Sequence, residues 1–173
     1  MKGIISTIFF ISISINVFAK NIYYQHFDKD TTPTICTFEQ LKPYLSTQSD
    51  SVFIINFWAT WCAPCVAELP YFEKLTAEIK GKKAKVILVS LDFKSQIQTK
   101  LLPFLKKKKL QSEVIVLVES NPNAWIPQVD NEWSGSIPAS LIFDKNKRSF
   151  YEQNFEKYED LIEVIKPFIN TNN

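Results

Sequence analysis

Two cysteines three positions apart, Cys62 and Cys65, are the residues of this 173-residue chain whose type and spacing most directly suggest chemistry. They stand in the segment Trp-Cys-Ala-Pro-Cys, after an apolar run and shortly before Pro70. A cysteine pair at this spacing can bind a metal ion, form a permanent disulfide, or open and close as a redox pair. The residues around the pair provide the evidence that distinguishes these three uses.

A structural zinc site needs four ligands, and the other candidates are Cys36 and the single histidine, His26. The number is just sufficient, but the setting argues against zinc. Zinc-binding pairs usually lie in polar turns, whereas this pair follows a predicted buried strand and begins a predicted long helix, which is typical of a redox pair. We therefore expect no metal ion and no organic cofactor.

A permanent disulfide would gain little from this spacing, because a loop closed over two intervening residues removes little entropy from the unfolded chain. With Cys62 at a helix start and Cys65 one turn later, both sulfur atoms face the same side. The unpaired N–H groups and the positive dipole end of the helix would stabilise a thiolate at Cys62, which makes it the predicted attacking group. Pro64 fits the first helical turn, where a missing N–H costs nothing. This geometry favours a disulfide that opens and closes reversibly.

The elements that would position this pair alternate between strands and helices. Residues 52–57 are apolar except for Asn56, as in a strand buried on both faces. Residues 62–80 place apolar side chains every three or four positions, as in a helix that packs by one face and ends near Gly81. Capping-box spacing between Thr37 and Gln40 predicts a short helix to about residue 46.

The rest of the chain continues this alternation. We predict further strands at 86–91, 114–118, 139–143 and 148–153, helices at 95–109 and 155–169, and a long loop at 119–136. Strands that alternate with helices indicate a mainly parallel sheet, and the hairpin of the last two strands adds an antiparallel edge.

The N-terminal residues 1–19 have the pattern of a secretory signal: a basic start, an uncharged apolar stretch, and Val17 and Ala19 at the positions that precede a cleavage site. The apolar stretch is shorter than the roughly 20 residues that a spanning helix needs, although an uncleaved membrane anchor stays open. We expect residues 20–33 to be a lead-in with little structure and residues 34–173 to form one domain. The mature chain would work in the periplasm or elsewhere in the cell envelope, where disulfides persist.

The charge of the chain is nearly balanced, at a net +2. A nucleic-acid partner would need a basic patch or stripe, so we expect no such partner. The run of four lysines at 106–109 is the local exception. We interpret it as the solvated end of a helix, which the helix dipole favours, and a contact with anionic lipid or with a partner stays open.

The segment 56–65, followed by Glu68 and Pro70, resembles the active-site segment of the thioredoxin superfamily. It is most similar to the TlpA/ResA-like thiol–disulfide reductases of bacterial envelopes. The resemblance covers residues 38–169, approximately, and it includes an Ile-Pro pair ahead of a predicted strand. It implies a thioredoxin-like three-layer α/β/α fold, with a central mixed sheet that has a parallel core and an antiparallel C-terminal hairpin.

The resemblance also implies roles for individual residues. Ile137–Pro138 would be a cis peptide bond lying against the cysteine pair, and the Ile137 backbone would hydrogen-bond an extended substrate segment. Trp61 would cover the disulfide and form part of the docking surface, with a rim or core position as the plainer alternative. Glu68 matches an acid that ResA-like proteins carry near their site; it would tune the cysteine pKa values, or else be a plain surface glutamate.

Three other residues depart from the family pattern or stand outside it. Asn56 occupies the position of a buried acid in cytoplasmic thioredoxins, and an amide cannot accept a proton from Cys65. Cys36 makes the number of cysteines odd. We expect a buried thiol near the first helix, with a third redox partner or an intermolecular link as alternatives. We assign no role to His26.

We therefore predict an envelope enzyme that reduces protein disulfides, in which Cys62 forms a mixed disulfide with the substrate and Cys65 resolves it. Its partners would be disulfide-containing envelope proteins, with apocytochrome c as one candidate, and a membrane thiol reductant of the DsbD/CcdA kind. A disulfide oxidase or isomerase stays open, and so does a redox-passive binding module of the same fold. A peroxidase is disfavoured, because no cysteine stands in the Thr-x-x-Cys setting of peroxiredoxins.

Overall fold

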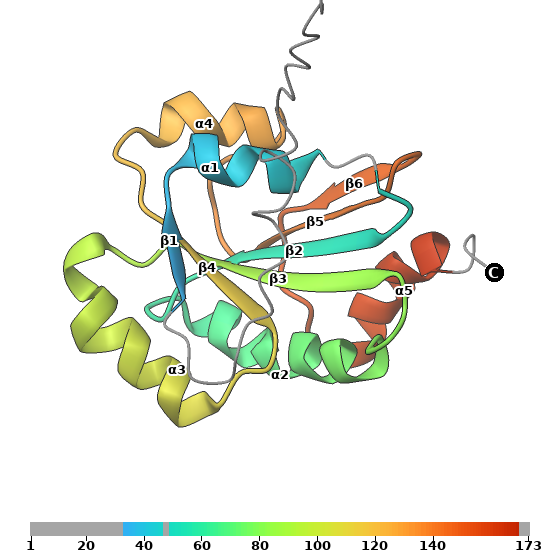
Figure 1. Cartoon of the computed structure of the whole chain (residues 1–173), viewed down its shortest axis with the longest axis horizontal. Helices are drawn as coiled ribbons and strands as arrows, with labels where there is room; N and C mark the ends of the chain where they lie inside the picture. Colours follow the sequence, from blue (N-terminus) through green and yellow to red (C-terminus); the bar gives the residue numbers. More distant parts are fainter. Residues whose placement is uncertain (1–32, 47–48, 170–173) are drawn as a thin grey trace, which may run out of the picture.

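The computed structural model describes residues 33–46 and 49–169, and within this part of the chain a six-stranded sheet crosses the molecule (Figure 1). The strands lie in the order β1-β4-β3-β2-β5-β6. They are β1 (Thr34–Cys36), β2 (Val52–Trp58), β3 (Ala84–Ser90), β4 (Glu113–Leu117), β5 (Ala139–Phe143) and β6 (Arg148–Tyr151). The first four in spatial order pair in parallel, whereas β5 pairs antiparallel with both β2 and β6. The predicted mixed sheet is confirmed.

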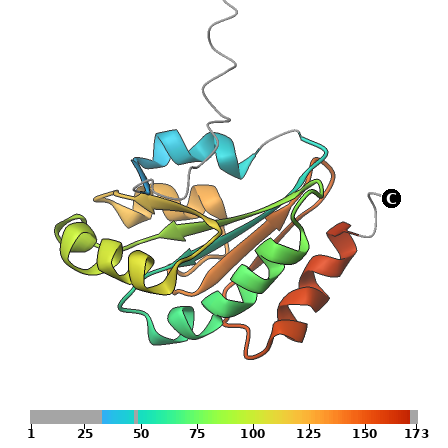
Figure 2. The ribbon, with the colours of Figure 1, turned by 60° about the horizontal axis from the view of Figure 1, so that its bottom comes forward.

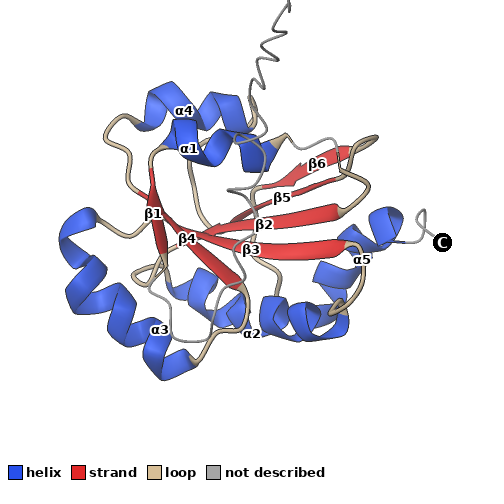
Figure 3. Cartoon of the chain, in the orientation of Figure 1, coloured by secondary structure: helices blue, strands red, loops and turns tan. Residues whose placement is uncertain are grey.

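Helices cover both faces of this sheet, which gives the three layers that the resemblance implied (Figure 2). One face carries α1 (Phe38–Leu41) and α4 (Pro122–Val129). The other carries α2 (Ala63–Glu78), α3 (Leu102–Lys108) and α5 (Tyr158–Ile169), as Figure 3 also shows. The short η1 (Lys42–Leu45) continues α1, while η2 (Lys94–Gln96) and the π-helical η3 (Ile97–Leu101) precede α3.

The central strand β2 is buried on both of its faces. Ile54 and Trp58 lie in the core shared with α2, α3 and α5, and Ile55 and Phe57 lie in the core shared with α1 and α4. This two-sided burial is what the apolar run at 52–57 predicted. Successive side chains of a strand point to opposite faces, so Asn56 faces the same side as Ile54 and Trp58, toward α2.

The helix α2 buries the apolar positions that its periodicity predicted. Leu69, Phe72 and Leu75 are buried against the sheet and α5. Gly81 follows the helix with a φ of +80°, in the left-handed region that favours glycine. The helix runs from Ala63 to Glu78 and its C-cap is Ile79, so the predicted end was two residues too late and Gly81 lies in the turn after the cap.

Two elements were absent from the predictions. The segment 119–136, predicted as a loop, contains α4, which begins with Pro122 and keeps Pro127 inside the helix. Proline is accommodated in a first helical turn but is disfavoured further along, which is why the sequence did not indicate this helix. The strand β1 has only three residues, of which Cys36 alone is buried, so no strand pattern is visible in the sequence.

Several predicted helices differ from the structure in form or extent. The segment 95–109, predicted as one helix, passes through a 3₁₀ turn and a π-helical turn before it becomes α3. The last helix begins at Tyr158 and not at Phe155, which is buried in the preceding loop. The four lysines at 106–109 are exposed at the end of α3, as the interpretation of this run as a helix end predicted.

The predicted signal at 1–19 and the lead-in up to residue 32 lie outside the described residues. Among the residues that are described, no helix is long and apolar enough to cross a membrane.

Candidate active site

The disulfide between Cys62 and Cys65 lies at the junction of β2 and α2. The Cα atoms of the two residues are 5.3 Å apart, within the usual range for a disulfide. Cys62 is the N-cap of α2, and the backbone N–H of Cys65 points at its Sγ atom, 3.3 Å away. A helix N-terminus carries unpaired N–H groups and a partial positive charge. In the reduced protein this arrangement favours a thiolate at Cys62.

The two cysteines differ in their access to solvent. Cys62 is 6% exposed, whereas Cys65 is at 0%. An incoming disulfide has to reach the sulfur that attacks it. The exposed fractions therefore favour Cys62 as the attacking residue and Cys65 as the resolving one, in the order that the sequence suggested.

The backbone of Ile137 lies against this disulfide. The Ile137–Pro138 peptide bond is cis, as the resemblance implied. The carbonyl oxygen of Ile137 is 3.6 Å from the Sγ atom of Cys62. The register of the sheet explains this contact: Ala139 of β5 stands opposite Phe57 of β2, so the residues just before β5 lie beside those just after β2.

An exposed aromatic pair borders the disulfide. Trp61 is 53% exposed and stacks on Phe93, which is 60% exposed, with ring centroids 5.9 Å apart. The buried carboxylate of Asp92 joins the two loops, because it accepts hydrogen bonds from the backbone N–H of Thr60 at 3.1 Å and from the Thr60 hydroxyl. Trp61 is therefore held at the rim of the site and not in the core.

Glu68 is buried, with 1% of its surface exposed, so the surface alternative was wrong. Its carboxylate accepts hydrogen bonds from the side-chain amide of Asn56 and from the backbone N–H of Phe155, each at 2.8 Å. Burial raises the pKa of Glu68 to about 7, and the two hydrogen bonds offset this only in part. A carboxyl group that exchanges its proton near neutral pH thus lies on α2, one turn after Cys65.

Asn56 connects Glu68 to the strand β5. It stands opposite Ser140 in the register of β2 and β5, and its amide also donates to the Ser140 hydroxyl at 3.2 Å. All three side chains are buried. Because an amide does not titrate in this pH range, the group of this trio that can take up a proton near neutral pH is Glu68.

Cys36 is a buried free thiol in β1, as predicted. Its side chain lies in the core with α1 and α4, whereas Cys62 and Cys65 belong to the core on the other face of the sheet. Burial raises the pKa of the Cys36 thiol to about 11, so the group is protonated at neutral pH. Both observations argue against the alternative of a third redox partner.

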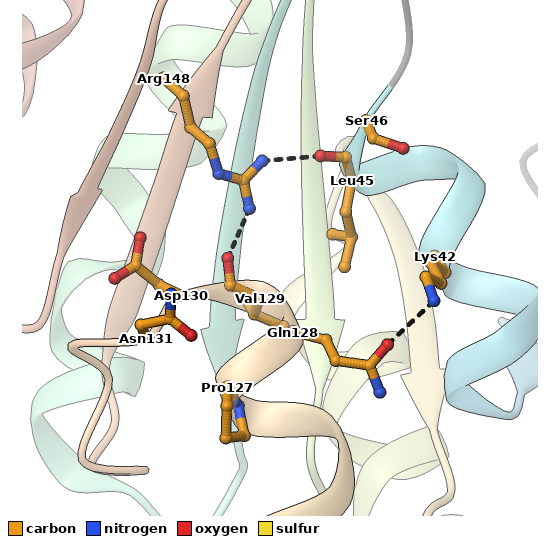
Figure 4. A pocket seen from close by; sticks show the side chains of 9 residues that line it. All are labelled: Lys42, Leu45, Ser46, Pro127, Gln128, Val129, Asp130, Asn131 and Arg148. Carbon is orange, nitrogen blue, oxygen red and sulfur yellow. Dashed lines mark hydrogen bonds between the residues drawn. The ribbon is translucent and has the colours of Figure 1, made fainter.

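A cavity of about 310 Å³ lies between η1, the end of α4 and β6 (Figure 4), and neither Cys62 nor Cys65 lines it. The guanidinium of Arg148 donates hydrogen bonds to the backbone carbonyls of Leu45 at 2.7 Å and Val129 at 2.5 Å. These bonds join three elements of the fold, so we assign Arg148 a structural role. Over residues 33–46 and 49–169, no group of three or more His, Cys, Asp or Glu side chains could hold a metal ion; His26 lies outside these ranges.

Some residues around the disulfide were not found from the sequence. Phe93 and Asp92 follow directly after a predicted strand. An aromatic residue and an acid at the end of a strand could have marked them as candidate site residues. The contact between Asn56 and Glu68 had no signal, because it depends on how α2 packs on the sheet.

Comparisons with known proteins find a matching family and relatives of this chain. The AhpC/TSA family matches residues 33–148. The thiol-disulfide oxidoreductase ResA of Oceanobacillus iheyensis is 46% identical over 54 residues, which cover 31% of this chain and 28% of that protein. The ResA of Bacillus cereus is 28% identical over 117 residues, which cover 65% of this chain and 62% of that protein. The chain thus spans less than two thirds of the length of either relative.

Among solved structures, a secreted thiol-disulfide isomerase from Corynebacterium glutamicum superimposes with a TM-score of 0.57 at 20% sequence identity. The match covers 70% of this chain and 72% of that one. At this level of identity the comparison shows the thioredoxin-like fold.

Proposed function

This chain belongs to the thioredoxin-like AhpC/TSA family, and we propose on that basis that it is a thiol–disulfide oxidoreductase that reduces protein disulfides through Cys62 and Cys65. The observation that carries the proposal is the combination of a disulfide at a helix N-terminus with the Ile137 carbonyl 3.6 Å from its more exposed sulfur. A passive disulfide would need neither feature.

The first step is attack by the Cys62 thiolate on one sulfur of a substrate disulfide. The substrate S–S bond breaks, a bond forms between Cys62 and the attacked sulfur, and the other substrate sulfur leaves as a thiolate that takes up a proton. The N–H of Cys65 and the helix N-terminus stabilise the charge on Cys62 before attack. The backbone of Ile137, beside Pro138, would align an extended substrate segment by hydrogen bonds, as in strand addition.

The second step releases the product. Cys65 loses its proton and attacks Cys62 Sγ, the mixed disulfide breaks, and the remaining substrate sulfur leaves as a thiol. Two electrons have then passed to the substrate, and the protein holds the disulfide that the structure shows. Glu68, with a pKa of about 7, is the nearest buried acid on α2 that can exchange a proton as Cys65 changes its charge.

The compartment and the partners are part of the same proposal. The signal-like segment 1–19 supports export to the cell envelope, where disulfide-containing proteins such as apocytochrome c would be substrates. Reduction there needs a continuing supply of electrons, and a membrane thiol reductant of the DsbD/CcdA kind would deliver them to the Cys62–Cys65 disulfide.

Reduction of insulin driven by dithiothreitol tests the proposal. The purified protein should accelerate precipitation of the insulin B chain at catalytic concentrations. A protein that leaves the rate at the level of dithiothreitol alone would be a redox-passive module, and the proposal would be rejected.

We expect Glu68→Gln to lower the pKa values of the reduced cysteines. A carboxylate disfavours a thiolate nearby, and the substitution removes that charge while it keeps the size of the side chain. Thiolate absorbance followed over a pH titration measures the effect, with Glu156→Gln as a control for loss of one negative charge at an exposed position. Superimposable titration curves for wild type and Glu68→Gln would mean that Glu68 does not tune the cysteines.

A further inference from the structure

One carboxylate holds one side of the loop at 134–136, which leads directly into Ile137. Glu152, which follows β6, accepts hydrogen bonds from the backbone N–H of Ser134 at 3.0 Å and from the backbone N–H of Ser136 at 2.9 Å. It also accepts a hydrogen bond from the Ser134 hydroxyl. Three donor groups from two residues, Ser134 and Ser136, thus converge on one side chain that is separate from the cysteine pair.

The opposite side of the same loop is also held. The indole N–H of Trp133, whose ring is buried, donates to the carbonyl of Ser136 at 2.8 Å. Gly135 has a φ of +96°, and a Cβ atom there would lie 3.1 Å from the Cδ1 atom of Ile126. The loop therefore has a defined shape that a larger residue at position 135 would disturb.

The negative charge of Glu152 strengthens its hydrogen bonds to the loop. Partial desolvation acts to raise its pKa, but the hydrogen bonds from Ser134 and Ser136 outweigh it, and the net pKa is lowered. At neutral pH the group is an ionised carboxylate, which can accept bonds at both oxygens, and hydrogen bonds to a charged acceptor are stronger than neutral ones.

We propose that Glu152 is a positioning residue for substrate docking: by holding the loop 134–136, it places the Ile137 backbone against Cys62. This inference rests on the proposed function, because it takes Ile137 as the residue that binds the substrate segment. Glu152 does not touch the sulfur atoms. It should therefore affect the capture of protein disulfides and leave the intrinsic reactivity of Cys62 unchanged.

Two substitutions at Glu152 should weaken the capture of protein disulfides to different degrees. Glu152→Gln replaces one of the two acceptor oxygens by an NH2 group, so the backbone N–H of either Ser134 or Ser136 loses the oxygen to which it donates, and Glu152→Ala leaves neither oxygen. The rate constant for reaction of the reduced protein with insulin should fall about threefold in Glu152→Gln and about tenfold in Glu152→Ala, since the net contribution of a hydrogen bond is on the order of a factor of two to ten in an equilibrium constant. The rate constant with hydroxyethyl disulfide, which has no extended segment to dock, should stay within about twofold of wild type.

Glu156→Gln is the matched control, because this exposed glutamate makes no side-chain hydrogen bond or ion pair within the described residues. It should behave as wild type with both disulfides. Gly135→Ala reaches the same loop without a change of charge and should reproduce the selective loss with insulin. Equal losses with both disulfides, or no loss with insulin in Glu152→Ala, would overturn the proposal.

Amide hydrogen exchange separates this proposal from the proposed function. In the oxidised protein, the N–H group of Ser134 should exchange about tenfold faster in Glu152→Ala than in wild type, because it loses its acceptor. The N–H group of Ser136, which keeps only the longer contact to the Ser134 hydroxyl at 3.4 Å, should also exchange faster. Unchanged exchange at both positions would overturn the claim that Glu152 holds the loop. A wild-type protein that fails to reduce insulin would instead contradict the proposed function, and the docking role of Glu152 with it.

Discussion

Cys62→Ser is expected to lower the rate of insulin reduction to the uncatalysed rate, because the attacking thiolate is lost. Cys65→Ser should also lose turnover, but for a different reason: Cys62 still attacks, and nothing resolves the mixed disulfide. Non-reducing gel electrophoresis of envelope extracts exposed to each variant measures the difference. Cys65→Ser should accumulate disulfide-linked adducts that disappear with reductant, and Cys62→Ser should accumulate none.

Cys36→Ser provides the matched control, since the same substitution is made at a cysteine in the opposite core. It should keep turnover and capture nothing. Adducts formed by Cys62→Ser in place of Cys65→Ser would show that the two roles are reversed, against the exposed fractions of the two residues.

Glu68→Gln is expected to stabilise the oxidised protein relative to wild type as the pH rises. The pKa of Glu68 is raised from 4.5 in the unfolded chain to about 7 in the folded one, so the folded chain holds this proton more tightly. The stability that this group contributes is fully present below its unfolded pKa and is lost as the pH rises through its folded pKa. From about pH 5 to about pH 8, the difference in unfolding free energy between variant and wild type should shift by about 2 to 3 kcal/mol in favour of the variant.

Urea unfolding of both oxidised proteins at the two pH values measures this shift. The oxidised state is chosen because the cysteines of the disulfide do not titrate in it. Comparing the variant with wild type at each pH removes the contribution of other titrating groups. A difference that stays constant with pH would mean that Glu68 is ionised in the folded protein at both values, against its burial.

The residues that could be predicted from the sequence are those whose role depends on near neighbours in the chain. The apolar run of β2, Pro64 in a first helical turn, and the spacing of Cys62 and Cys65 are all local features, and each indicated its structure correctly. The cis bond before Pro138 came from the resemblance alone, because most X–Pro bonds are trans and no local feature marks this one.

The features that could not be predicted depend on contacts between distant segments. Glu68 is buried because α2 and the loop before α5 close over it, and its partner Phe155 is 87 residues further along. Glu152 similarly meets Ser134 through the hairpin of β5 and β6. Sequence spacing carries no information about such contacts. The helix α4 was not predicted for another reason. It contains Pro122 and Pro127, and two prolines this close together are more typical of a loop than of a helix.

The reduction potential of the Cys62–Cys65 pair, measured by equilibrium with a thiol redox buffer, tests most directly whether this pair is a reversible protein-disulfide reductant. We predict full and reversible titration in the folded protein, with a potential nearer to the value of about −270 mV for thioredoxin than to that of about −120 mV for DsbA. A potential close to the DsbA value would contradict reduction and favour an oxidase. A disulfide that opens only when the protein unfolds would contradict redox exchange altogether.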